Sequence, residues 1–210
     1  MKKTDKKTAK DATKNITKQI AKNTTKRVDK KINKNDKEFV IARMFNAPQE
    51  SVFKAWTDAR HMEHWFGPND FQIPLCRMDV RPGGAYRIVM RSKDDVDYAL
   101  KGVYKEVVAP KRIVMTQDTS EHPAEWKDII NPDRKKEKDN LKDDPVGEIL
   151  LDVEFEKRDW KTKLTIRMSF ESSKIKDAMV KLGMAQGWGQ SLDRLDKCLS
   201  NFEMVELYTF

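Results

Sequence analysis

The feature that most constrains the fold is a single apolar stripe along residues 173–202. The stripe consists of Ile175, Met179, Leu182, Trp188, Leu192, Leu195, Leu199 and Phe202. Most of these positions are three or four residues apart, with one wider gap before Trp188, and this spacing predicts one long amphipathic helix. The apolar face of such a helix must pack against another element. The only expected partner of sufficient length is a β-sheet.

Alternation of apolar and polar residues predicts that sheet. We expect strands at 38–45, 71–80, 85–91, 97–108 and 111–117, and then a hairpin that turns at 157–159. In the hairpin, Ile149, Leu151, Val153 and Phe155 lie on one face, and Leu164, Ile166, Met168 and Phe170 lie on one face of the next strand. One apolar face per strand is typical of an antiparallel sheet that is covered on one side.

Two short helices are expected between the first two strands. Pro48 suits the first turn of a helix, and the residues from Val52 to Trp56 give that helix one apolar face. A second helix over 59–66 should end at Gly67-Pro68. The fold class is therefore α+β, with six or seven antiparallel strands, two short helices after the first strand, and one long C-terminal helix.

A twisted sheet that bends around a helix leaves a cavity between them. We expect side chains from both layers and from the short helices to line it, with Trp126 as a lid contact. The candidate ligand-binding residues are Trp65, Phe66, Tyr86, Met90, Tyr104, Met115, Trp126, Met168, Met184 and Trp188. Methionine and aromatic side chains adapt to varied apolar ligands. The alternative is that they fill an ordinary core and that Trp126 only anchors its loop.

The charge is concentrated in an N-terminal arm. Residues 1–37 carry fourteen basic and four acidic side chains, a net charge of +10, whereas the remaining twenty-eight basic and thirty acidic side chains give −2. Lysine recurs at every fourth position from Lys2 to Lys34, among Thr and Asn. We expect a disordered or weakly helical arm. It either makes electrostatic contact with nucleic acid or an anionic membrane, or serves only as a solubilising extension.

We expect residues 38–210 to form the globular domain, interrupted by a charged excursion at 118–146 that contains three prolines. Loops of this length are usually functional or mobile. No stretch is long and apolar enough for a membrane helix, and the N-terminus has no secretory signal. We therefore expect a cytoplasmic protein.

The sequence offers no clear catalytic or metal-binding constellation. Cys76 lies on an expected strand and Cys198 near the apolar stripe, so both are interpreted as structural thiols. His61 and His64 share one face of a helix, but a metal site needs a third ligand, and none is evident. We expect His61 to be partly exposed and His64 to pack beside Trp65. No metal, no cofactor and no catalytic residue is predicted.

Several motifs together resemble a known superfamily. They are Ala47-Pro48, Val52 with Trp56-Thr57-Asp58, His61 with Trp65-Phe66-Gly67-Pro68, Asp79-Val-Arg-Pro-Gly-Gly84, Gly102-Val-Tyr104 with Glu106, Pro110-Lys-Arg-Ile113, and Gly187-Trp188 with Leu192, Leu195 and Leu199. The chain from about 38 to 202 is similar to the SRPBCC (START-like, Bet v-like, helix-grip) superfamily. Within it, the chain resembles the bacterial branch related to the C-terminal domain of the activator of the ninety-kilodalton heat-shock chaperone ATPase.

The resemblance implies the order β-α-α-β-β-β-β-β-β-α and a ligand-sized cavity. Members of the superfamily bind lipids, hormones or polyketides, and some are cyclases or hydrolases. The eukaryotic chaperone activator also needs a separate N-terminal domain, and residues 1–37 are too short and too polar to be that domain.

Three functional hypotheses follow from the residues and the resemblance. The first is binding of a small apolar or amphipathic ligand in the cavity, without catalysis. The second is a chaperone-activator or other protein-interaction role, and the third is a cyclase or hydrolase activity. Contact of the 1–37 arm with nucleic acid or membrane could accompany any of them.

Overall fold

The computed structural model describes residues 36–132 and 146–206, with side chains as far as residue 200. The elements are, in order, β1 (Glu38–Phe45), α2 (Gln49–Thr57), α3 (Ala59–Trp65), β2 (Gln72–Met78), β3 (Ala85–Arg91), β4 (Asp97–Val108), β5 (Arg112–Gln117), α4 (Ala124–Ile130), β6 (Ile149–Arg158), β7 (Lys161–Ser169), α5 (Ser173–Lys181) and α6 (Met184–Glu206). The α+β class is confirmed, and the expected strands, the two short helices and the long last helix occur in the expected order, but α4 between β5 and β6 and α5 before α6 are additional helices.

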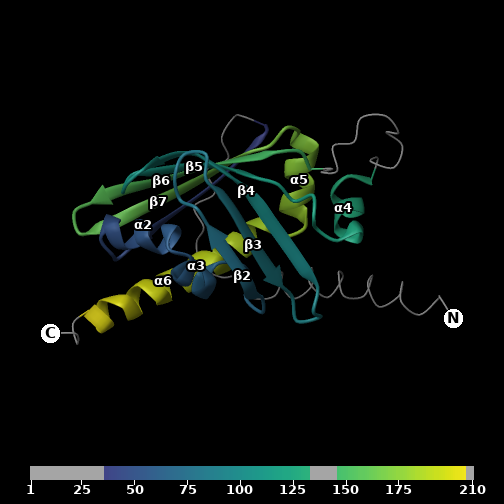
Figure 1. Cartoon of the computed structure of the whole chain (residues 1–210). Coiled ribbons are helices and arrows are strands. Elements are labelled where there is room, and N and C mark those ends of the chain that lie inside the picture. The colour runs from purple at the N-terminus through teal and green to yellow at the C-terminus, as the bar shows by residue number, and fades with distance from the viewer. Residues whose placement is uncertain (1–35, 133–145, 207–210) are drawn as a thin grey trace.

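The seven strands form one antiparallel sheet in the order β1-β7-β6-β5-β4-β3-β2. Because β1 and β2 are the two edge strands, α2 and α3 carry the chain from one edge of the sheet to the other. The sheet curves around α6, and α2 and α3 lie beside that helix near one end (Figure 1). The hairpin turn differs slightly from expectation. The β6 strand continues to Arg158, and the reversal falls at Asp159, whose φ of 55° suits a tight turn.

The predicted long C-terminal helix is present, but it begins at Met184 instead of Ser173. Residues 173–181 form the separate helix α5, and Leu182 is its C-cap residue. The break falls at Gly183, whose φ of 98° lies in the left-handed region that glycine adopts without steric cost. The apolar stripe runs through both helices, so hydrophobic spacing alone could not reveal the break.

One end of the space between sheet and helix is filled by aromatic rings. The indole of Trp56 stacks on that of Trp188, with ring centroids 6.1 Å apart, and lies 5.0 Å from that of Trp65. The ring of Phe155 meets Trp56 edge-on at 6.1 Å. This aromatic cluster forms a close-packed core under α2 and α3. The open space lies at the other end, where α4 and α5 are found.

Part of the charged excursion is helical. Helix α4 lies within it and contacts α5, whereas residues 133–145 lie outside the described part of the chain. The basic arm also lies outside it, apart from residues 36 and 37. Among the described helices, none is both long and apolar enough to cross a membrane.

Candidate functional site

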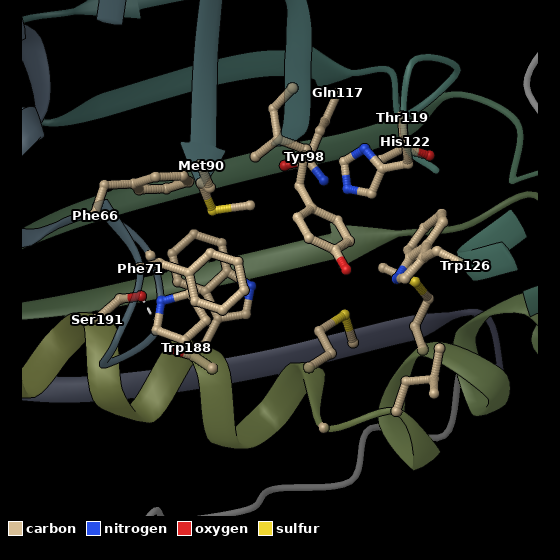
Figure 2. A pocket seen from close by; sticks show the side chains of 18 of the residues that line it. Phe66, Phe71, Met90, Tyr98, Gln117, Thr119, His122, Trp126, Trp188 and Ser191 are labelled. Atoms are coloured by element: carbon tan, nitrogen blue, oxygen red, sulfur yellow. Dashed lines mark hydrogen bonds between the residues drawn. The ribbon is translucent and has the colours of Figure 1, made fainter. Parts of the chain in front are cut away.

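A cavity of about 200 Å³ lies between the sheet and the helices α4, α5 and α6. Figure 2 shows side chains from both layers pointing into it. Its described lining consists of Phe66, Gly67, Pro68, Phe71, Met90, Tyr98, Leu100, Gln117, Thr119, His122, Trp126, Met168, Met179, Leu182, Gly183, Met184, Gly187, Trp188 and Ser191. We call this space the main cavity. Most of its surface is contributed by apolar, aromatic and methionine side chains.

The structure places six of the ten predicted site residues around the main cavity. They are Phe66, Met90, Trp126, Met168, Met184 and Trp188. Tyr86, Tyr104 and Met115 instead line a second space of only about 10 Å³, closer to α3. The Tyr86 hydroxyl is already engaged, since it donates a hydrogen bond of 2.8 Å to the Thr116 carbonyl. A space of this size holds about one water molecule, so these three residues belong to the packed core.

Trp65 lines neither cavity. It is fully buried at the end of α3, and its Nε1 donates a hydrogen bond of 2.9 Å to the carbonyl of Ala55. The residue after it, Phe66, leaves the helix and reaches the main cavity. Neighbouring aromatic residues in the sequence thus have different roles, because the helix ends between them.

Several lining residues were not predicted from the sequence. Tyr98 and Leu100 lie on the same face of β4 as Tyr104, so strand alternation could have identified them. Gln117, Thr119 and His122 come from the end of β5 and the loop that follows it. No periodic pattern points to these polar residues, because the loop reaches the cavity only through tertiary packing.

The floor of the main cavity is held by a contact between the sheet and α6. The indole Nε1 of Trp188 donates to the sulfur of Met168 at 3.1 Å. Met168 is 1% exposed and lies near the C-terminal end of β7. Because the Trp188 ring also stacks on Trp56, the cavity wall is continuous with the aromatic core.

Among the described residues that line the main cavity, His122 is the only histidine, and its side chain is buried. It is 7% exposed, and its ring centroid lies 5.4 Å from that of Tyr98 and 4.4 Å from that of Trp126. Burial lowers the pKa of His122 from its ordinary value of 6.5 to about 4, and nearby Lys127 acts in the same direction. The imidazole is therefore neutral at physiological pH.

An ion-pair network fixes the loop that carries His122. The carboxylate of Glu121 accepts two hydrogen bonds from the Arg87 guanidinium, at 2.7 and 2.5 Å, and lies 3.2 Å from Lys101 Nζ. Its pKa falls to about 2, mainly because of the hydrogen bonds from Arg87. The His122 amide then donates to the Thr119 carbonyl at 2.9 Å. These contacts join the loop to β3 and β4 and so position the imidazole.

Comparison with known proteins identifies the family. A family model described as "Activator of Hsp90 ATPase homolog 1-like protein" matches residues 46–200. The chain belongs to this family. The match confirms the resemblance seen in the motifs. No curated protein matches the chain.

Solved bacterial structures share this activator-like fold. The similar structures include a protein from Nitrosomonas europaea (20% identity, 82% of this chain and 99% of that chain covered, TM-score 0.66), one from Arthrobacter aurescens (22% identity, 85% and 93% covered, TM-score 0.66), and one from Rhodobacter sphaeroides (15% identity, 83% and 99% covered, TM-score 0.67). At these identities the likeness shows the fold alone.

The two cysteines of the chain are poor nucleophiles. Cys76 is buried on β2, and burial raises its thiol pKa to about 12. Burial also raises the pKa of the Cys198 thiol. Since only the thiolate is reactive, both residues behave as packing side chains at neutral pH.

The two histidines of α3 differ in their surroundings. His61 is partly exposed, whereas His64 is exposed instead of packed beside Trp65, and its Nδ1 lies 2.6 Å from the Arg60 carbonyl. Within the described ranges, no group of three or more potential metal ligands comes together.

Proposed function

We propose that this chain binds a small, largely apolar molecule in the main cavity. The observation that carries the proposal is a pocket of about 200 Å³, partly open to solvent, in a domain whose other end is tightly packed. Protein interiors normally leave few voids larger than a water molecule, because lost packing contacts destabilise the fold. A pocket of this size, walled by the sheet and the helices, therefore favours a binding role.

The size of the cavity suits a ligand of one or two rings. For comparison, an engineered apolar cavity of about 150 Å³ in another protein stays dry and binds benzene. The main cavity is somewhat larger and has methionines on several sides, including Met90, Met179 and Met184. Methionine side chains are flexible and polarisable, so they adjust to ligands of different outline.

The charge of the lining also favours an apolar ligand. Among the described lining residues there is no Asp, Glu, Lys or Arg, and the single histidine is neutral. An ionic ligand would lose its hydration there without gaining an ionic partner. The lining thus resembles that of small-molecule sites, which combine apolar walls with a few polar groups.

Filling the cavity should abolish binding. In the Met184→Trp variant a larger ring occupies the space near α6, and we expect the affinity for naphthalene to fall at least tenfold, the equivalent of losing the burial of about two methylene groups. Met184 is half-buried, so the change should be tolerated better than at fully buried Met168. Binding can be followed on the full chain by NMR, from the indole N–H signals of Trp188 and Trp126.

The matched control is Met44→Trp, which makes the same replacement on an edge strand, where the side chain is 48% exposed and away from the cavity. This variant should bind naphthalene as the natural chain does. If naphthalene shifts no indole signal in the natural chain, or if both variants bind equally well, the proposed function is wrong.

A further inference from the structure

The wall of the main cavity contains a buried amide group. Gln117 is the last residue of β5, and its backbone pairs with that of Ile149 on β6. Alternate positions of a strand share a face, so Gln117 follows Ile113 and Met115 on the covered face of the sheet. Its side chain is 7% exposed and lines the main cavity, and Figure 2 shows it reaching from the sheet toward that space. A polar group thus occupies the last inward position of an otherwise apolar strand face.

The side-chain amide of Gln117 has no hydrogen-bond partner within the described part of the chain. Two other glutamines are buried to the same extent, and both are paired. Gln49 Nε2 donates to the Phe155 carbonyl at 2.5 Å, and Gln190 Oε1 accepts from the Asn69 amide at 3.0 Å. The amide atoms of Gln117 bond to no described residue, and they are not sealed within the packing, so they face the open space that this side chain lines. Buried polar groups are almost always paired, and the partner is therefore expected from a molecule in the cavity.

Water alone gives an incomplete account of this amide. Gln117 also borders the second space, whose volume of about 10 Å³ suffices for about one water molecule. A carboxamide has two N–H donors and an oxygen with two lone pairs, so one water leaves part of it unpaired. Water that enters the main cavity can pair with the rest, but a ligand that displaces this water must reproduce its hydrogen bonds to bind well. The amide therefore restricts the chemistry of the ligand.

We propose that Gln117 selects uncharged ring compounds that carry a hydrogen-bond donor and an acceptor on neighbouring positions, so that the ligand class is a cyclic amide. This inference rests on the proposed function and names the ligand class for the same site. The ring N–H donates to Gln117 Oε1, and the ring carbonyl accepts from Gln117 Nε2, so that the two amides pair edge to edge. The rest of the ring system lies among apolar side chains of the lining, such as Met90, Leu100 and Trp188.

The lining favours this class over related ones. A ketone, an ether or an aromatic ring nitrogen only accepts, and it would leave the Gln117 oxygen without a donor. A carboxylate has the outline of an amide, but at neutral pH it is charged and has no proton to donate. No basic side chain is present among the described lining residues to stabilise it. A cyclic amide is neutral and presents its donor and acceptor side by side, as the carboxamide of Gln117 does.

Probes of similar outline separate the possibilities. Full-length protein is titrated at neutral pH with 2-quinolone, quinoline, naphthalene and 2-naphthoate, and dissociation constants are taken from the indole N–H signal of Trp188 in NMR spectra. We expect 2-quinolone to bind about tenfold more tightly than quinoline, which lacks the donor, because it makes one more neutral hydrogen bond. Binding of 2-naphthoate should be the weakest.

Two variants assign the preference to one side chain. Gln117→Met keeps an unbranched side chain of similar length, and it should weaken the binding of 2-quinolone about tenfold while naphthalene binds as it does to the natural chain. The matched control, Gln190→Met, makes the same replacement at a hydrogen-bonded glutamine outside the described lining. This control should keep the preference for 2-quinolone. Where Gln117→Met does not fold, Gln117→Glu, which has the outline of glutamine but no amide donor, should show the same loss.

Each other outcome decides against one or both of the proposals. Equal affinities for 2-quinolone and quinoline in the natural chain, or an unchanged preference in Gln117→Met, would overturn the assignment of the amide site, while binding of naphthalene would still support the cavity as a binding site. Tightest binding of 2-naphthoate, or loss of the preference in Gln190→Met as well, would overturn the assignment too. Binding of none of the four probes would overturn the proposed function and this inference together.

Discussion

The His122→Phe variant is expected to lose much of the acid sensitivity of the natural protein. In the folded chain the pKa of His122 is about 4, against 6.5 for a free imidazole. Between these values the unfolded chain binds a proton that the folded chain does not, so the free energy of unfolding decreases as the pH falls. The full pKa difference corresponds to a decrease of about 3 kcal/mol in the free energy of unfolding, caused by His122 alone. Above about pH 6.5 the residue contributes no pH dependence.

Urea unfolding followed by tryptophan fluorescence, in steps across this pH range, measures the effect. The pKa of His61 is also lowered by burial, but this residue is present in both proteins, so the difference between their stability curves isolates His122. If the unfolding free energies of the natural chain and of His122→Phe change with pH in parallel, the imidazole of His122 titrates in the folded protein much as it does in water.

The architecture could be predicted because it depends on local patterns. In β6 and β7, apolar residues alternate with polar ones, as they do in a strand with one covered face. In α6, apolar residues recur with the period of a helix, so each pattern can be recognised within a single element. The bounds of β1, β3 and β4 agree with the expected ranges for the same reason. The break at Gly183 could not be predicted, since an isolated glycine is tolerated in a helix and the stripe continues on both sides of it.

The site was predictable only in part. Met90, Met168 and Trp188 point inward because their elements place them on the covered face, and periodicity reveals this. Periodicity shows which face of a strand is covered, but it does not show which part of that face borders a cavity and which part is tightly packed. For this reason Tyr86 and Tyr104 were expected in the ligand site, although they lie in the packed core. The loop carrying His122 depends on the Arg87–Glu121 contact between residues far apart in sequence, and no local pattern encodes it.

The second large effect is expected from Arg194→Ala. Arg194 lies on α6, half-buried, and its guanidinium donates to four backbone carbonyls where α3 ends. They belong to His64 at 3.0 Å, Phe66 and Gly67 at 3.2 Å, and Pro68 at 3.1 Å. The last carbonyls of a helix have no partner within the helix, so a cation there both satisfies them and interacts favourably with the helix dipole. Removing the guanidinium should lower the free energy of unfolding by about 3 kcal/mol, since hydrogen bonds from charged groups are the stronger ones.

The control for this prediction lies one residue away on the same helix. Asp193 forms an exposed ion pair with Arg43 at 2.5 Å, and Asp193→Ala should lower the free energy of unfolding by less than about 1 kcal/mol, as is usual for exposed ion pairs.

The comparison also bears on function, because three of the carbonyls that accept from Arg194 belong to Phe66, Gly67 and Pro68, which line the main cavity. Arg194→Ala should therefore weaken naphthalene binding even where the protein remains folded, while Asp193→Ala should not. Equal unfolding free energies for the two variants would show that water replaces the guanidinium at the end of α3, and that this wall of the cavity is held by the packing of Phe66 alone.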